Sequence, residues 1–375
     1  MKFINDYTNK FQIVWDLGRR CTYACSYCPP HRNNKTSRLV DLDELIETMD
    51  FIDEYFSMYQ EFRQDHNKLI PSLSFTGGEP TIHPDFFKFA VYVKQTYGDK
   101  YNFNLTTNGA FSGKTLKMVE ENIDGGTISY HPESTEIQKL MVRNTIWQLG
   151  HKFRVNVMFS KYHFDECIEL CNDLKKEGIK FTPRRIGDDG GSQTSIDKGY
   201  THIYTEEQEE YFNSFFGTKS AKCGRSCCGM RKLGTECGTT QYIDDTNFQG
   251  WHCGVNWQFL YLNSETRHVW THQTCMVNLD GEVAPLGHLD DPGKMLDDLQ
   301  NKLYEPGGFP VIRCPKKFCG CGMCADKSTD FDKYVDLQED KVKRLKFKEV
   351  DQVKPLPERN PYTVIMEQID AAKEV

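Results

Sequence analysis

Arg20-Cys21-Thr22-Tyr23-Ala24-Cys25-Ser26-Tyr27-Cys28 is the stretch of this chain that carries the most structural information. Its three cysteines are spaced C-x3-C-x2-C and follow an apolar run, residues 11–17. Three thiolates on one short loop can ligate three irons of a [4Fe–4S] cluster and leave the fourth iron open. An open coordination position can bind a substrate or a cofactor, as it does in catalytic metal centres. A zinc knuckle or a chance clustering of cysteines is the alternative.

A second motif, Gly77-Gly78-Glu79-Pro80, follows a short strand-like segment, residues 72–76. Glycines let the backbone approach a ligand closely, Glu79 supplies an anion, and Pro80 stiffens the exit from the turn. The same four residues also suit an ordinary turn. Their position after the second predicted strand, with the cysteine loop after the first, favours one shared site.

Segments with strand and helix character alternate as far as residue 185. We expect strands over residues 11–17, 73–76, 101–107, 126–130, 153–159 and 179–185. We expect helices over residues 42–58, 84–97, 113–122, 135–149 and 164–176. Six such units predict an α/β fold in which helices cover a parallel sheet. The chemistry should lie at the C-terminal ends of the strands, as in complete barrels.

The two motifs and this order of elements resemble the radical SAM superfamily. The resemblance implies a partial (β/α)6 TIM-like barrel whose Cys21, Cys25 and Cys28 hold a [4Fe–4S] cluster. It implies that S-adenosylmethionine (SAM) binds the open iron through its amino and carboxylate groups. Reductive cleavage of SAM would then produce a 5′-deoxyadenosyl radical.

The same resemblance implies residues that bind SAM. Tyr27 would pack near the adenine, and the backbone and acid of the second motif would hold the amino group of the methionine moiety. The positions implied in that motif are Gly77, Gly78, Glu79 and Pro80.

Polar residues also stand at the ends of predicted strands three, four and six. They are Thr107 and Asn108, Ser129 and His131, and Arg184 and Arg185. Family members often contact the SAM ribose or carboxylate at the first pair. His131 could contact SAM or act as a general base, and an exposed turn histidine is equally consistent. An arginine in the barrel mouth suits a carboxylate or phosphate; alternatively, one arginine packs against the rim and the other faces water.

Ten of the fifteen cysteines follow residue 222. The sequence shows no signal peptide and no apolar run of membrane-spanning length. We therefore expect a cytoplasmic protein that uses these thiols for metal rather than for disulfides. Cys167 and Cys171, four apart on a predicted helix, should be buried small hydrophobes.

The cysteine pattern of the second half resembles the SPASM or twitch extension of radical SAM enzymes. Cys253, Cys275 and a compact cysteine-rich loop surround a predicted hairpin with Asp280-Gly281 at its turn. The extension implies one or two auxiliary [4Fe–4S] clusters. The ligands that it implies are Cys253, Cys275, Cys314, Cys319, Cys321 and Cys324.

The spacing of these cysteines departs from the usual pattern of such extensions. Four further cysteines could supply missing ligands or donate a hydrogen atom to a substrate radical. They are Cys223, Cys227, Cys228 and Cys237. A structural zinc site is the alternative for this region, because four thiolates also suit tetrahedral zinc.

Length and charge limit the remaining possibilities. The 375 residues accommodate a core barrel over 1–200, a small α+β cysteine-rich extension over 201–330 and a charged tail over 331–375. The net charge of −8 disfavours a polynucleotide partner, which would require a basic face.

These features predict an enzyme that modifies a peptide or protein by oxidation, crosslinking or epimerisation. It would receive electrons from a donor such as flavodoxin or ferredoxin, without a membrane partner. The alternatives are action on a nucleoside, sugar or other small molecule, and a non-catalytic metal-binding protein.

Overall fold

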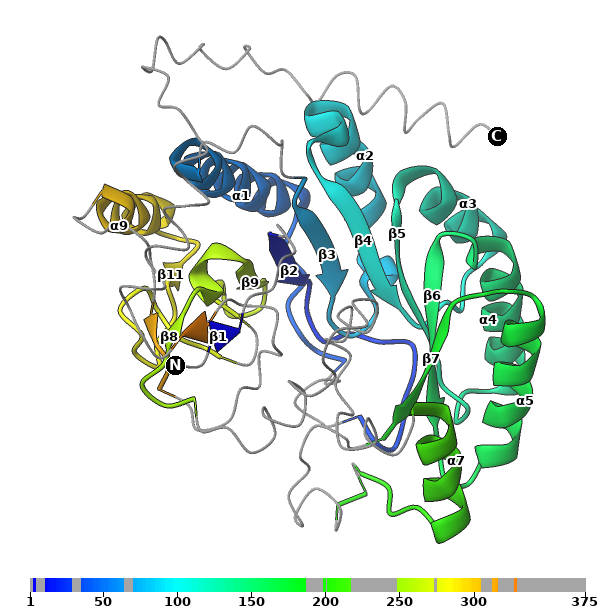
Figure 1. Ribbon diagram of the computed structural model, residues 1–375. Coiled ribbons are helices and arrows are strands. Elements are labelled where there is room, and N and C mark those ends of the chain that lie inside the picture. The colour runs from blue at the N-terminus through cyan, green and yellow to red at the C-terminus, as the bar shows by residue number, and fades with distance from the viewer. Residues whose placement is uncertain are drawn as a thin grey trace, which may run out of the picture.

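A nine-stranded, mostly parallel sheet forms the centre of the computed structural model (Figure 1). The structure describes residues 3–4, 11–28, 35–63, 70–186, 198–199, 201–216, 248–272, 275–304, 312–315 and 327–328. The predicted tail, 331–375, lies outside these residues, as do residues 187–197 of the predicted barrel and 217–247 of the predicted extension.

Six parallel strands follow one another in chain order across this sheet. They are β2 (Gln12–Asp16), β3 (Ser72–Thr76), β4 (Asn102–Thr107), β5 (Gly125–Tyr130), β6 (Phe153–Phe159) and β7 (Phe181–Arg185). This order confirms the predicted α/β fold with a partial (β/α)6 barrel. All six expected strands are present within two residues of their predicted bounds.

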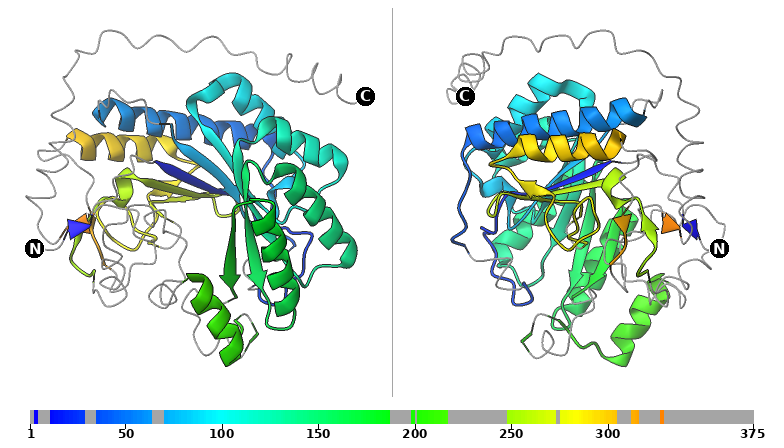
Figure 2. Two further views of the ribbon diagram at one scale, coloured as in Figure 1. Left: turned by 45° about the vertical axis from the view of Figure 1, so that its right-hand side comes forward. Right: turned by 90° about the vertical axis from the view of Figure 1, so that its left-hand side faces the viewer.

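Five helices cover the outer face of these strands (Figures 1 and 2). They are α1 (Leu42–Arg63), α2 (Phe86–Tyr97), α3 (Gly113–Asn122), α4 (Glu136–Leu149) and α5 (Phe164–Lys176). The hydroxyls of Ser112 and Thr135 cap α3 and α4, and such caps typically contribute about 1 kcal/mol each. The second helix begins at Phe86 after Asp85, two residues later than the expected start at residue 84.

The two faces of the sheet differ in polarity because side chains alternate along each strand. Ile13, Trp15, Leu73 and Phe75 point toward the helices and are fully buried. The opposite, inner face carries mostly polar side chains, so the interior of the partial barrel is available to polar ligands. Cys167 and Cys171 are buried on α5, as predicted.

The cysteine-rich part of the chain extends the same sheet beyond β2. Strand β9 (Phe259–Asn263) pairs with β2 in parallel, and β10 (His268–Trp270) and β11 (Gly287–His288) continue antiparallel. Helix α9 (Pro292–Tyr304) lies beside α1 (Figure 2). The barrel and part of the predicted extension are therefore joined by main-chain hydrogen bonds.

A second, four-stranded sheet contains short segments that are distant in sequence. Its order is β1 (Phe3–Ile4), β13 (Lys327–Ser328), β8 (His252–Cys253) and β12 (Ile312–Arg313). The predicted Asp-Gly turn forms nearby, with Asn278 N–H bonded to the Glu282 carbonyl. The expected hairpin strands are absent at residues 275–284. The Asn278 side chain instead accepts the N–H groups of Asp280 and Glu282, which competes with ladder formation.

Helix α7 (Glu206–Phe216) was not expected from the sequence, and it packs against β6 and α5 through Phe212. Within the described parts of the chain, none of the helices combines the length and apolar character of a membrane span.

Candidate active site

The cysteine loop and the Gly-Gly turn lie against each other at the C-terminal ends of β2 and β3. The N–H of Gly78 donates to the Gly18 carbonyl at 2.8 Å, and the N–H of Glu79 donates to the Arg20 carbonyl at 2.7 Å. A Cβ on Gly77 would lie 2.3 Å from the Gly18 oxygen, and one on Gly78 would lie 2.0 Å from the Arg20 oxygen. These glycines are needed because the two loops pack closely.

Glu79 connects this turn to the end of β4. Its buried carboxylate accepts four hydrogen bonds, from the Thr81 N–H and hydroxyl, the Thr107 hydroxyl and the Asn108 N–H. Desolvation raises the pKa of Glu79, and the hydrogen bonds oppose that shift. Glu79 therefore fixes the relative positions of two predicted site residues, Thr107 and Asn108.

The three cysteines of the loop are half-buried and form no disulfide. The Tyr23 N–H donates to the Cys21 sulfur at 3.4 Å, and the Asn108 amide lies 3.9 Å from the same sulfur. Burial raises the pKa of Cys25 to about 12.

The described residues contain no group of three His, Cys, Asp or Glu side chains that could hold a single metal ion. Each ligand of a [4Fe–4S] cluster binds a different iron, so the predicted cluster does not require the three thiols to form a single-ion site.

The loop between β5 and α4 packs against the cysteine loop. Glu133 accepts the Ser26 N–H at 2.8 Å and the Ser26 hydroxyl at 2.9 Å. The Tyr27 hydroxyl is 2.7 Å from Nδ1 of His131. Desolvation lowers the pKa of His131 to about 4, so the ring is neutral near pH 7. His131 is thus a packed partner of Tyr27 rather than an exposed turn histidine.

The two arginines at the end of β7 point in opposite directions. Arg185 pairs with Glu209 of α7 at 2.6 Å, and its guanidinium lies 4.5 Å from the centre of the Phe212 ring. Arg184 points to the inner face, where its Nε donates to Asn156 at 3.3 Å. This arrangement favours Arg184 over Arg185 as a ligand-binding residue.

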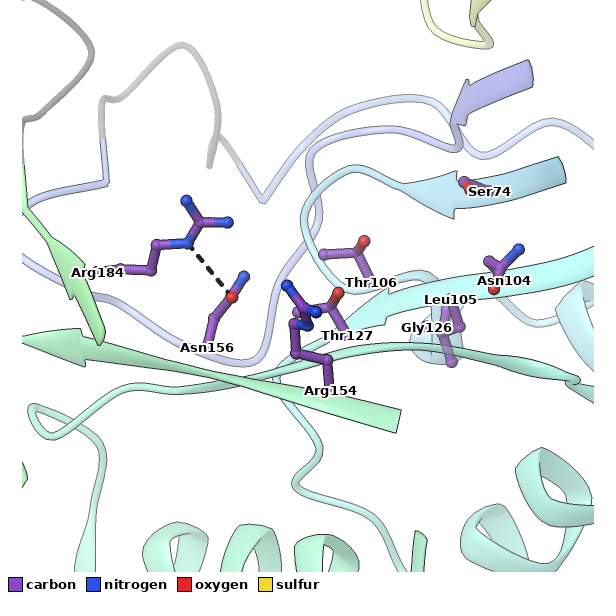
Figure 3. Close-up of a pocket in the computed structure, with 9 residues that line it drawn as sticks. All are labelled: Ser74, Asn104, Leu105, Thr106, Gly126, Thr127, Arg154, Asn156 and Arg184. Atoms are coloured by element: carbon purple, nitrogen blue, oxygen red, sulfur yellow. Dashed lines mark hydrogen bonds between the residues drawn. The ribbon is translucent and has the colours of Figure 1, made fainter. Parts of the chain in front are cut away.

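A cavity of about 330 Å³ lies on the inner face of the sheet (Figure 3). The residues that line it are Ser74, Asn104, Leu105, Thr106, Gly126, Thr127, Arg154, Asn156 and Arg184. Of these, only Arg184 was predicted as a site residue. The alternation in β6 could have identified Arg154 and Asn156, because buried Phe153, Val155 and Val157 occupy the other face.

The turn after β9 also contributes to this end of the barrel. Glu265 pairs with Arg19 of the cysteine loop at 3.0 Å, and Trp15 donates to the Ser264 hydroxyl at 2.8 Å. The sequence offers no local signal for these contacts, since about 250 residues separate the partners.

Three predicted auxiliary ligands lie together in a separate apolar cluster. Cys253, Cys275 and Cys314 are buried there with Trp251 and Phe259, among others. The pairing of β8 with β12 contributes to this arrangement, because Cys253 is opposite Ile312 in the ladder. The other predicted cysteines lie outside the described residues: Cys223, Cys227, Cys228, Cys237, Cys319, Cys321 and Cys324.

Comparison with protein families gives a match between the Radical SAM superfamily and residues 15–190. The matched segment includes the cysteine loop, the Gly-Gly turn and strands β3–β7. No curated protein sequence gives a significant match.

Several solved structures show remote similarity. Streptococcus suis SuiB bound to precursor peptide SuiA is 14% identical, with a TM-score of 0.44 over 72% of this chain and 60% of SuiB. The structure of anSMEcpe with bound AdoMet and Cp18Cys peptide is 15% identical, with a TM-score of 0.45 over 90% and 98% of the two chains. BtrN in complex with AdoMet and 2-DOIA is 12% identical, with a TM-score of 0.31 over 78% and 87%. The chain thus spans about 60% of the SuiB length, and the match to the Radical SAM superfamily covers residues 15–190.

Proposed function

We propose that this chain is an enzyme that cleaves SAM reductively and uses the resulting 5′-deoxyadenosyl radical to abstract hydrogen from a substrate, because residues 15–190 match the Radical SAM superfamily. The superfamily uses a [4Fe–4S] cluster and SAM, which together supply the one-electron chemistry when bound. The chain itself would hold these groups, orient them and exclude water from the reacting atoms.

The packing of the cysteine loop against the Gly-Gly turn is the observation that carries this proposal. Cys21, Cys25 and Cys28 would hold the cluster beside that turn. The N–H groups of Gly78 and Glu79 are already bonded to the cysteine loop, so the turn would receive the SAM amino group through acceptor atoms. Thr107 and Asn108, both positioned by Glu79, lie at the adjacent strand end and are candidates for binding SAM.

Tyr27 and His131 form the other wall of this site. The hydrogen bond between them fixes the Tyr27 ring, consistent with the proposed packing of that ring near the adenine. Ser129, on the inner face of β5, and Pro80, which begins a short helical turn after Glu79, remain proposed SAM-binding positions.

We propose a peptide or protein as the substrate and an auxiliary [4Fe–4S] cluster in the extension. The auxiliary cluster rests on the cysteine pattern, and three of its proposed ligands, Cys253, Cys275 and Cys314, are buried members of one apolar cluster of side chains. Flavodoxin or ferredoxin is the proposed electron donor. A small-molecule substrate is the second candidate, because the polar cavity of about 330 Å³ reaches the lower end of the volumes of small-molecule sites, about 300–1,000 Å³.

The proposal is tested by anaerobic reconstitution with iron and sulfide, reduction with dithionite, and quantification of 5′-deoxyadenosine by mass spectrometry. Wild-type protein should produce it, and Cys25→Ala should produce none. Cys171→Ala is the matched control, because Cys171 is buried on α5 away from the loop. Wild-type rates from Cys25→Ala would rule out the proposed cluster site.

A further inference from the structure

Strands β6 and β7 place two arginines on the inner face of the barrel. Arg154 is the second residue of β6 and Arg184 the fourth residue of β7. Arg154 is in register with Thr127 of β5, which is in register with Thr106 of β4. Figure 3 shows both arginine side chains on the same side of the sheet, together with those threonines.

The cavity that these arginines line carries an excess of positive charge. None of its nine described lining residues is acidic, and its other polar groups are amides and hydroxyls. Arg154 is exposed to the cavity and forms no ion pair with the described residues. By contrast, Arg19, Arg185 and Arg267 each pair with a glutamate within 3.0 Å.

A guanidinium group in a concave site attracts oxyanions and binds them through paired N–H donors. The field of two like charges further concentrates anions in such a cleft. Neighbouring hydroxyl and amide groups, such as those of Thr106, Thr127 and Asn156, can donate to the remaining lone pairs of a bound oxyanion.

Arg154 lies well before the end of its strand, whereas Arg184 is one residue from the end of β7 and in register with Met158 of β6. Arg154 precedes the strand end at Phe159 by five residues, so its Cα lies roughly 16 Å below that end at ~3.3 Å per residue. The carboxylate of SAM belongs near the cysteine loop if SAM binds the open iron as the superfamily resemblance implies. The anion at Arg154 would therefore belong to another molecule.

We propose that Arg154 and Arg184 bind a carboxylate or phosphate group of the substrate. This inference rests on the proposed function, since it assumes that the barrel holds a substrate below SAM. It narrows the substrate to a molecule with an anionic end that enters the barrel and a reacting end that reaches the cysteine side.

The test is calorimetric titration of the reconstituted full chain with sodium phosphate and with sodium acetate at constant ionic strength. Wild-type protein should bind at least one of them saturably, and the preferred anion identifies the source as phosphate or carboxylate. Arg154→Gln and Arg184→Gln should each weaken binding tenfold or more. Lys117→Gln removes the same charge from the outer helix α3 and should leave binding unchanged.

Arg154→Lys keeps the charge without the planar donor fork and should bind more tightly than Arg154→Gln. Circular dichroism of each variant shows whether the fold is retained. Equal affinity of wild type and Arg154→Gln overturns the inference, as does a lack of saturable binding of both anions to wild type.

Failure of the anion-binding inference can be distinguished from failure of the proposed function. Production of 5′-deoxyadenosine by wild-type protein is measured separately. Arginine-dependent anion binding without 5′-deoxyadenosine would support the anion site and reject the radical chemistry. Production of 5′-deoxyadenosine without arginine-dependent anion binding would support the chemistry and reject the anionic substrate.

Discussion

The Glu79 carboxylate accepts a hydrogen bond from the Asn108 backbone N–H at 2.7 Å. Because the same carboxylate also accepts from Thr107, one side chain from the end of β3 fixes the backbone at the end of β4. The acid of the Gly-Gly-Glu-Pro motif thus has a structural role that is separate from any contact with SAM.

Glu79→Gln should destabilise the fold and weaken SAM binding together. Glutamine has a single acceptor oxygen. Either the Asn108 N–H, which donates to Oε2, or the Thr81 and Thr107 donors, which bind Oε1, would therefore lose their acceptor. The loss of a buried acceptor costs about 1–3 kcal/mol, measurable by urea unfolding of the metal-free protein. Glu121→Gln on the exposed face of α3 is the control. A Glu79→Gln protein with wild-type stability would contradict the role assigned to this carboxylate.

Gly78→Ala should abolish SAM cleavage, because its Cβ would lie 2.0 Å from the Arg20 carbonyl oxygen. The turn and the cysteine loop must then separate. Gly113→Ala provides a matched control, since nothing lies within 4 Å of a Cβ at the start of α3. Activity and far-ultraviolet circular dichroism of both variants check this prediction. Full activity of Gly78→Ala would show that the two loops need not touch.

Glu133→Ala should accelerate loss of the cluster from reconstituted protein. The Ser26 N–H and hydroxyl lose their acceptors, and the segment between Cys25 and Cys28 is held less firmly. The decay of visible cluster absorbance in the presence of a chelator measures this effect, and we expect it to be several-fold faster. Glu136→Ala, which removes an exposed carboxylate of α4, should match wild type. Identical decay of both variants would remove Glu133 from the set of positioning residues.

Iron content should distinguish the two proposed metal sites. A Cys21/Cys25/Cys28→Ala variant should retain about four irons per chain if the extension holds a [4Fe–4S] cluster. A Cys253/Cys275/Cys314→Ala variant should lose those irons and still cleave some SAM. Iron, sulfide and zinc analyses of both variants are required. Zinc without sulfide in the first variant would favour the structural zinc site instead.

Local sequence patterns predicted the barrel well, and non-local contacts explain most of what they missed. The alternation in β6 identified that strand because one face packs against helices. The pairing of β9 with β2 has no comparable local signal, since the pairing partner depends on the fold of the intervening chain. The opposite orientations of Arg184 and Arg185 follow from strand alternation. The ion pair between Arg185 and Glu209 could not be predicted, because it depends on where α7 packs.

The packing role of the motif glycines and the hydrogen-bonding role of Glu79 also could not be predicted from the sequence. A Gly-Gly-Glu-Pro segment is compatible with ligand contact or with loop packing, and only the positions of Gly18 and Arg20 show the packing. Arg154 was missed because it stands near the beginning of β6, while the expected chemistry lay at the strand ends. Cys253, Cys275 and Cys314 were selected by residue type, and the apolar cluster around them was not apparent from their spacing.

The parallel pairing of β9 with β2 has a consequence for dissecting the protein. A fragment that ends near residue 200 would leave the main-chain groups of β2 without their neighbour on one side. Exposed strand edges recruit other chains and promote aggregation. The first strand of the barrel, which leads directly into the cysteine loop, is therefore completed by a segment translated 247 residues later, since Gln12 pairs with Phe259. Iron insertion into the nascent chain before that segment emerges would take place while β2 still lacks its pairing with β9.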